Sequence, residues 1–342
     1  MRVALVKGRI DRESEPTFAE GLTRKPPYYF FSQIILELEP ACRNQGWDVD
    51  ILSVGKPAPQ RLRIPDVLVN LITEPLVCRR ALDRLETIVR MNGLPILNSV
   101  EAIRRSGRTA LPGVICESKA ANVRVPLTTR FSGGLEQLER HIEAHTHRWP
   151  VLLRPVGTHS SIGLTRVDNP SQLRALAAVP KDLLVTDFVD FRSGDGLYRK
   201  YRMIWVDGTM FRRHVIAAVN WNVTGKSRAD MAERPETIMA EKEFLASGGA
   251  LDDRVAGLFR IVGLDFGVID FAVSDAGEII VFELNGTFQI SRSIPGKYLA
   301  EWGYLEANNT SIINALIASV ARRAVKPSRS ELNSAQDPAV KQ

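Results

Sequence analysis

LDFGVIDFAVSDAGEIIVFELNG, residues 264–286, is the stretch of sequence that predicts most about this chain. Two largely apolar runs lie on either side of the turn-forming residues 274–277. Small and polar residues between two such runs are typical of a β-hairpin. Because most positions in both runs are apolar, we expect this hairpin to be buried.

Strand alternation predicts what each face of the hairpin carries. With a two- or four-residue loop, Val268 is expected opposite Glu283. Alternate side chains point to opposite faces, so Asp270, Glu283 and Asn285 should share one face. The opposite face is expected to hold a set of apolar side chains: Ile269, Phe271, Val273, Ile280, Phe282 and Leu284.

The polar face predicts a metal site. Two carboxylates and an amide on a buried wall would repel one another and lose hydration, which costs several kcal/mol. Mg²⁺ removes both problems, because it binds oxygen ligands of this kind and enters with a phosphorylated substrate. Asp270, Glu283 and Asn285 are therefore the predicted metal ligands. The alternative is an ordinary hairpin whose acidic side chains face water.

A second segment, WPVLLRPVGTHSSIGLTRV at residues 149–167, predicts a phosphate-binding loop. A strand at 151–153 delivers Arg154 to its end, and residues 157–163 are mostly small. Such a loop lets backbone N–H groups and hydroxyls approach phosphate oxygens. The Arg154 guanidinium can grip a phosphate through two N–H groups. The alternative is a flexible hairpin tip.

Four segments together resemble the ATP-grasp superfamily, which includes D-alanine–D-alanine ligases, glutathione synthetases and the ligases that add glutamate to a ribosomal protein. The phosphate loop of that family matches RPVGTHSSIG at 154–163, and its adenine-holding strand matches LVTDFV at 184–189. YRKYRMIWVDG at 198–208 resembles a strand pair of the glutamate-adding ligases, with Arg202 at the family arginine. Asp270 and the later ELN at 283–285 match the metal ligands in order and spacing. The resemblance covers roughly residues 95–320.

Three positions depart from the family pattern. Arg154 stands where a lysine usually grips the α- and β-phosphates, so the charge is kept. Thr186 stands where the adenine-binding strand normally has an acid. Val268 stands where dipeptide ligases have an arginine that stabilises the oxyanion, so another donor must serve there or the acceptor geometry differs.

The resemblance implies an enzyme with an ATP-grasp fold, an α/β protein of α+β lobes behind an N-terminal doubly wound domain. It implies an ATP-dependent carboxylate–amine ligase that forms an amide or peptide bond through an acyl phosphate and releases ADP and phosphate. The expected cofactors are ATP and Mg²⁺, as two ions, with Mn²⁺ as an alternative. The expected substrates are a small carboxylate and an amine of amino-acid or peptide kind.

The resemblance also assigns residues to roles. Of the three arginines at 104, 105 and 108, we favour Arg108 as the second phosphate-binding cation. Arg202 and His214 are the expected catalytic residues. Arg292 and Asn70 are expected to contact substrate. The alternative for Arg292 is an exposed surface charge, and the alternative for Asn70 is an amide that only bonds a turn. The expected ATP-binding residues are Arg108, Arg154, His159, Ser160, Ser161, Gly163, Asp187, Phe188 and Val189.

Two other functions stay open. A kinase-like phosphotransferase on the same fold would need no amine and would give a stable phosphorylated product. A non-catalytic, nucleotide-binding regulatory protein is the third alternative, and Arg154 and Val268 favour it because both depart from the catalytic family pattern.

Composition agrees with a globular protein of several lobes. The chain has 342 residues, of which 44% are hydrophobic and 25% charged. It has three widely spaced cysteines, which favours reduced cytosolic thiols, and we expect a cytoplasmic location. The net charge of +6 comes from scattered basic residues, so we expect no nucleic-acid partner. No apolar run is long enough to span a membrane, and a homodimer is left open.

The hydrophobic pattern divides the chain into four parts. Residues 1–95 are expected to form the N-terminal α/β domain, with strands at 3–6, 48–52 and 67–71 and a helix at 30–37. Residues 96–190 should hold a linker helix and the small lobe, with a helix at 134–144. Residues 191–325 should form the C-terminal lobe, ending in a helix at 310–323. Residues 326–342 are rich in polar residues and are expected to be disordered.

Overall fold

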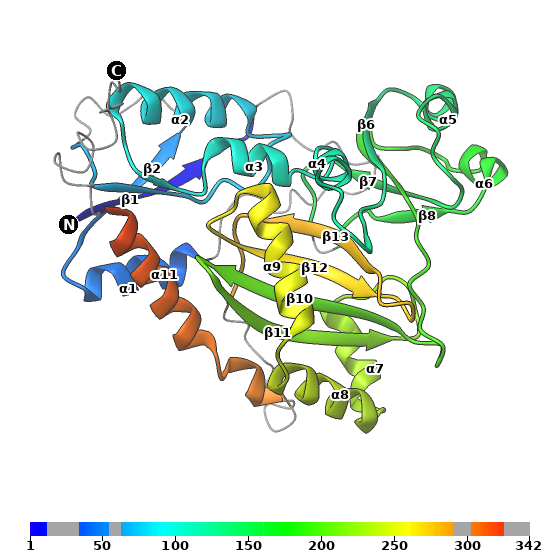
Figure 1. Cartoon of the computed structure of the whole chain (residues 1–342). Helices are drawn as coiled ribbons and strands as arrows, with labels where there is room; N and C mark the ends of the chain where they lie inside the picture. Colours follow the sequence, from blue (N-terminus) through cyan, green and yellow to red (C-terminus); the bar gives the residue numbers. More distant parts are fainter. Residues whose placement is uncertain (12–33, 55–62, 160, 291–301, 325–342) are drawn as a thin grey trace, which may run out of the picture.

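The computed structural model describes residues 1–11, 34–54, 63–159, 161–290 and 302–324 (Figure 1). The first sheet of the molecule is wholly parallel. The sheet has the order β2-β1-β3-β4. Its strands are β1 (Arg2–Gly8), β2 (Asp48–Val54), β3 (Val67–Asn70) and β4 (Ile96–Leu97). The helices α1 (Ile35–Asn44) and α2 (Arg79–Asn92) cover its two faces (Figure 1).

Helix α1 differs from its predicted range. Residues 30–33 lie outside the described part of the chain, and the helix continues past Glu37 to Asn44. It contains Pro40, which removes one backbone hydrogen bond from the helix. Leu38 and Cys42 are fully buried against the sheet, and this packing outweighs the unfavourable proline.

A small antiparallel sheet follows two short helices. The helices are α3 (Val100–Ser106) and α4 (Leu111–Ser118). The sheet has the order β6-β9-β7-β8, with β6 (Thr128–Ser132), β7 (Val151–Pro155), β8 (Thr165–Val167) and β9 (Asp182–Asp187). Helix α5 (Leu135–Ala144), close to its predicted range, and helix α6 (Pro170–Arg174) pack on it.

The third sheet carries the hairpin predicted from residues 264–286. Its order is β11-β10-β12-β13-β5. The strands are β5 (Val123–Arg124), β10 (Tyr198–Val206), β11 (Thr209–Ala218), β12 (Phe266–Val273) and β13 (Ile279–Asn285). The helical segments are η2 (Gly225–Ser227), α7 (Arg228–Ala232), α8 (Pro235–Ala246), α9 (Ala250–Val262), η4 (Gly303–Glu306) and α11 (Asn309–Ala324).

Helix α9 lies across one face of this third sheet (Figure 1). Phe259 of α9 stacks on Trp205 of β10 with ring centroids 5.9 Å apart. Tyr201 stacks in the same way on Phe271, at 5.4 Å. With this face closed by aromatic packing, the polar side chains of the strands are left on the opposite face.

Asn98 ties the hairpin to the start of α3. It is fully buried in the left-handed region, at φ 57°. Its amide donates to the carbonyls of Phe266 and Gly286, both at 2.9 Å. Its side-chain oxygen accepts from the backbone N–H groups of Asp265 and Phe266, at 2.9 and 3.2 Å. This one side chain therefore fixes where both strands of the hairpin meet the rest of the molecule.

The α/β fold class predicted from the sequence is confirmed, and α11 lies within one residue of its predicted range at either end. The division into four parts stays a prediction, and its last part lies outside the described residues. None of the helices in the described ranges has the length and apolar character needed to cross a lipid bilayer.

Candidate functional site

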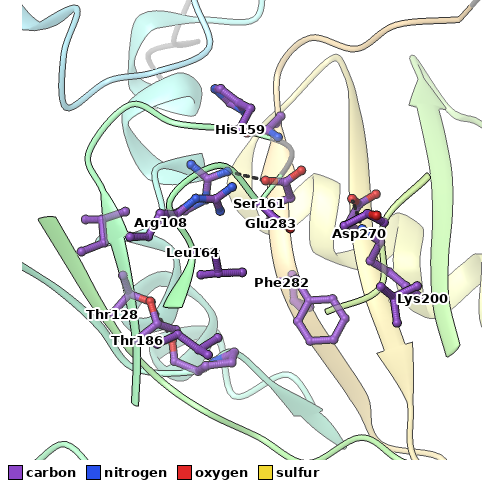
Figure 2. A pocket seen from close by; sticks show the side chains of 18 of the residues that line it. Arg108, Thr128, His159, Ser161, Leu164, Thr186, Lys200, Asp270, Phe282 and Glu283 are labelled. Atoms are coloured by element: carbon purple, nitrogen blue, oxygen red, sulfur yellow. Dashed lines mark hydrogen bonds and ion pairs between the residues drawn. The ribbon is translucent and has the colours of Figure 1, made fainter. Parts of the chain in front are cut away.

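A cavity of about 500 Å³ lies between the small sheet and the third sheet. Strands β7 and β9 line one side, and β10, β12 and β13 line the other. Figure 2 shows Arg108, Thr128 and Thr186 on one side, facing Asp270 and Lys200. This volume is typical of a small-molecule or cofactor site.

Asp270 and Glu283 lie directly opposite each other in the antiparallel pair β12–β13. The predicted pairing of Val268 with Glu283 is wrong, because Val268 pairs with Asn285. The difference arises from a five-residue loop and from a bulge between Asp270 and Phe271. The three predicted metal ligands still line one cavity, as the sequence predicts.

The bulge also changes which apolar residues face the cavity. Phe282 lines the cavity and packs on Phe191 with ring centroids 4.9 Å apart. Ile280 packs in the same group as Phe191 and Tyr198, apart from the core that holds Ile269. Ile280 and Phe282 were therefore predicted on the wrong face, since one extra residue reverses the alternation beyond it.

Arg202 binds Asp270 through two hydrogen bonds. Its Nε and Nη2 lie 2.6 and 2.7 Å from the two carboxylate oxygens. The geometry follows from the sheet, because Arg202 of β10 pairs with Asp270 of β12. Lys200 Nζ lies 3.7 Å from the same carboxylate. Burial by itself would lower the pKa of Arg202, but its interactions with the neighbouring carboxylates, chiefly Asp270, together have the larger and opposite effect. The pKa of Arg202 is therefore raised, and the guanidinium is charged.

Arg108 binds the second acid of the hairpin. Its Nη2 donates to Glu283, and its Nη1 donates to Glu74 at 3.1 Å. Burial would raise the pKa of Glu283, but its neighbours, chiefly Arg108, lower it well below its usual range. The sequence argument left neutralisation of the hairpin acids to a metal ion, whereas the structure shows arginine partners for both.

The loop after β7 approaches the same place. Arg154 Nε donates to the hydroxyl of Thr158 at 3.3 Å. Burial and the neighbouring Arg108 lower the pKa of Arg154 to about 10. His159 Nε2 lies 2.9 Å from a Glu74 oxygen, an ion-pair distance whose alignment falls short of a hydrogen bond. Ser161 lines the cavity beside them.

The other end of the cavity is less charged. Thr186, which stands where the family has an acid, shares a hydrogen bond of 3.1 Å with Thr128. Phe188 meets Trp221 edge to face at 5.7 Å and lies under the Arg166 guanidinium at 4.1 Å. Apolar rings beside paired hydroxyls suit a nucleobase.

Most of the predicted site residues line this cavity. Those that do are Arg108, Arg154, His159, Ser161, Asp187, Phe188, Val189, Arg202, Asp270, Glu283 and Asn285. Gly163 is not in the lining but lies between Ile162 and Leu164, which are; its φ is 67°, and a Cβ atom there would meet the Pro155 ring at 2.8 Å. Ser160 and Arg292 lie outside the described residues.

Two of the predicted site residues, Asn70 and His214, are buried in the fold and do not line the cavity. Asn70 is fully buried, donates to the carbonyl of Asn98 at 3.0 Å and accepts from the N–H of Ile72 at 3.1 Å. His214 is buried in β11, opposite Arg202 in the strand pairing. Neither belongs to the cavity lining of the described chain. Their roles in substrate binding and catalysis therefore gain no support from their positions.

Two residues at the site were missed by the sequence reasoning. Glu74 follows β3 in a loop without a recognisable motif, so only the three-dimensional fold brings it to Arg108. Lys200 lies two residues before Arg202 on the same strand, and alternation alone could have placed it on the same face.

The oxygen atoms of Asp270, Glu283 and Asn285 suit a hard divalent cation such as Mg²⁺. Within the described ranges, no group of three or more His, Cys, Asp and Glu side chains converges as metal ligands, and a metal ion at the hairpin would use Asn285 as its third protein ligand. Four cationic side chains, Arg108, Arg154, Lys200 and Arg202, stand against three carboxylates in this network. This local excess of fixed positive charge around the hairpin favours an anionic ligand.

Comparison with solved structures identifies the fold. VanG D-Ala:D-Ser ligase from Enterococcus faecalis matches with a TM-score of 0.53 and 12% identity, over 95% of this chain and 99% of that one. A RimK domain ATP-grasp protein from Sphaerobacter thermophilus matches at 0.50 and 16%, over 94% and 100%. D-alanine–D-alanine ligase from Bacillus anthracis, complexed with ATP, matches at 0.50 and 11%, over 95% and 98%.

No family model and no curated protein sequence matches the chain. The likeness is therefore one of structure, and it extends over nearly the whole of both chains in each comparison. The chain has the ATP-grasp fold, as its motifs predict.

Proposed function

We propose that this protein is an ATP-dependent carboxylate–amine ligase that forms an amide or peptide bond and releases ADP and phosphate. The observation that supports it most is the meeting of Asp270, Glu283 and Asn285 with Arg108 and Arg154 in one cavity. Oxygen ligands opposite fixed cations suit a nucleoside triphosphate with its metal ion. The ligases with the same fold support the reaction class.

Each part of the cavity has a role in this proposal. Phe188 and Val189 at the end of β9 hold the base, while Arg154, Arg108 and the loop of 157–163 hold the triphosphate. Asp270, Glu283 and Asn285 would hold Mg²⁺, which supplies charge neutralisation at the β- and γ-phosphates. Arg202 and Lys200, on the third sheet, place positive charge where the γ-phosphate would react with the substrate carboxylate.

Rate acceleration in this scheme comes from position and charge. A substrate carboxylate attacks the γ-phosphorus of ATP and becomes an acyl phosphate, with ADP as the leaving group. An amine then attacks the acyl carbon, and phosphate leaves as the amide bond forms. Val268 offers no charge at the oxyanion position, and Arg202, on the neighbouring strand, is the candidate donor for that role. Exclusion of water from the cavity when the substrates are bound would limit hydrolysis of the intermediate.

The test is release of ADP from ATP over a panel of carboxylic acids and amines, with products identified by mass. The proposal predicts turnover that needs both cosubstrates and gives an amide. Asp270→Asn should reduce turnover roughly a hundredfold or more, because the variant loses a charged group that stabilises the phosphoryl group during its transfer. Asp253→Asn, on the exposed first turn of α9, is the matched control. Equal turnover without an acid and an amine, or a stable phosphorylated product, would contradict the ligase assignment.

One observation favours a non-catalytic, nucleotide-binding role as the second candidate. Arg202 occupies both oxygens of Asp270, so a metal ion must displace part of a tight ion pair. Glu283→Gln separates the two functions. A catalyst loses ADP release across the whole panel, whereas a binding protein shows no turnover in either form and only a change in nucleotide affinity.

A further inference from the structure

Glu74 is a buried carboxylate next to the first sheet that contacts two residues of the cavity lining. It lies in the loop after β3 and is 5% exposed. Its carboxylate lies 3.1 Å from Arg108 Nη1 and 2.9 Å from His159 Nε2. Arg108 comes from the segment between α3 and α4, and His159 from the loop after β7. Three distant segments of the chain therefore meet at one acid.

This acid is ionised in spite of its burial. Burial would raise the pKa of Glu74, but the charges of Arg108 and His159 lower it more, and the pKa lies below its usual range. A charged group kept out of water needs paired partners, and Glu74 has two. The Glu74 carboxylate is thus a fixed negative charge in contact with Arg108 and His159, both of which line the cavity.

The two ends of the Arg108 guanidinium have separate partners. Nη1 binds Glu74, while Nη2 binds Glu283, one of the proposed metal ligands. If Glu283 turned to a metal ion, Arg108 would still be held through Nη1. Among the residues that the structure describes, Arg108 Nε has no hydrogen-bond partner although it is buried. A buried donor of this kind is suited to a ligand oxygen.

We infer that Glu74 is a positioning residue, which holds Arg108 and His159 towards the phosphates of a bound nucleotide. The inference rests on the proposed nucleotide site and extends it to a residue next to the first sheet. Glu74 itself touches no nucleotide in this account. It keeps Arg108 in place while Glu283 exchanges its arginine partner for a metal ion.

The sign of one affinity change tests this role. Glu74→Gln removes a negative charge near a polyanion, so simple electrostatics predicts tighter binding of nucleotide. Loss of positioning predicts the opposite, because Arg108 is then drawn to Glu283 and His159 loses its partner. Only the positioning role predicts weaker binding from removal of a negative charge.

The experiment is calorimetric titration of the full chain with a non-hydrolysable ATP analogue and Mg²⁺. We expect Glu74→Gln to bind roughly tenfold more weakly, the size of one charge-assisted hydrogen bond. Binding of AMP, which lacks the outer phosphates, should be unchanged. Glu86→Gln is the control, since Glu86 pairs with Arg104 at 2.9 Å on the surface and the charge change is the same.

Equal or tighter binding of the analogue by Glu74→Gln overturns the inference. Should that variant fail to fold, Glu74→Asp keeps the charge and shortens the reach, and unchanged affinity in Glu74→Asp overturns it as well. Absence of nucleotide binding by the unaltered chain would instead refute the proposed function, so the two failures are distinguishable.

Discussion

Asp270 and Glu283 face each other across the β12–β13 pair, and each carboxylate is held by a different arginine. Arg202 reaches Asp270 from the neighbouring strand, and Arg108 reaches Glu283 from outside the sheet. The two acids therefore stand side by side without an excess of negative charge. A metal ion bound at these two acids would therefore have to displace the arginines that already pair with them.

The ion pair of Arg202 with Asp270 predicts a loss of stability on mutation. Asp270→Asn removes the carboxylate that Arg202 binds through two hydrogen bonds and leaves Glu283, 3.9 Å away, as a weaker charged neighbour, so we expect a loss of about 3 kcal/mol in the free energy of unfolding. Denaturant unfolding measures it. Asp253→Asn should stay within about 0.5 kcal/mol. A double variant, Arg202→Gln with Asp270→Asn, should recover part of the loss. Equal stability of Asp270→Asn and the unaltered chain would contradict the pairing.

The two lowered glutamate pKa values predict the pH dependence of stability. Glu74 and Glu283 have pKa values below the ordinary value of 4.5 in the folded chain. Carboxylates of this kind contribute stability that is fully present above the ordinary value and is lost as the pH falls below it. Glu283→Gln should therefore flatten the fall in stability below pH 4.5, in thermal unfolding measured at several pH values. An unchanged slope of stability against pH would show that the cationic neighbours of Glu283 do not lower its pKa.

Gly163 closes the loop after β7 in a conformation that favours glycine. Its φ is 67°, and a Cβ atom would lie 2.8 and 2.9 Å from two atoms of the Pro155 ring. Gly163→Ala should shift the loop and weaken binding of the ATP analogue several-fold. Gly196→Ala is the matched control, because Gly196 also has a positive φ, of 84°, but a Cβ atom there meets nothing within 4 Å. Equal affinities of the two variants would count against a role for the loop.

Asn98 predicts that the hairpin depends on one buried amide. Asn98→Ala removes two donated and two accepted hydrogen bonds and leaves buried backbone groups without partners, so we expect a loss of at least about 3 kcal/mol. Asn98→Gly relieves the positive φ but not the lost bonds, so it should be nearly as unstable. Asn92→Ala, which removes one exposed bond to the Ile88 carbonyl, is the control. Chemical unfolding of the three variants gives the comparison.

The β12–β13 hairpin could be predicted because its signal is local. Alternation within residues 264–286 was enough to bring Asp270, Glu283 and Asn285 to one face. The bulge after Asp270 could not be predicted, since it depends on how β12 fits between its neighbours in the sheet. Phe282 was consequently assigned to the wrong face.

The charges around the hairpin were harder to predict. Arg108 was selected by its resemblance to a family position, but its two glutamate partners are 34 and 175 residues away in sequence. Nothing in the local sequence around Glu74 distinguishes it from a surface acid. Asn70 makes the turn-type bond that the sequence left open as its alternative role, because a polar residue at a strand end also suits a buried structural bond.

The central claim is that a metal–triphosphate unit lies between the hairpin and the loop of residues 157–163. A crystal structure of the chain with Mn²⁺ and a non-hydrolysable ATP analogue tests it most directly, because anomalous scattering locates the ions. We predict ions within ligand distance of the Asp270 and Glu283 carboxylates, with the triphosphate beside Arg108 and Arg154. A nucleotide bound elsewhere, or bound in this cavity with no ion at those two carboxylates, would contradict the account.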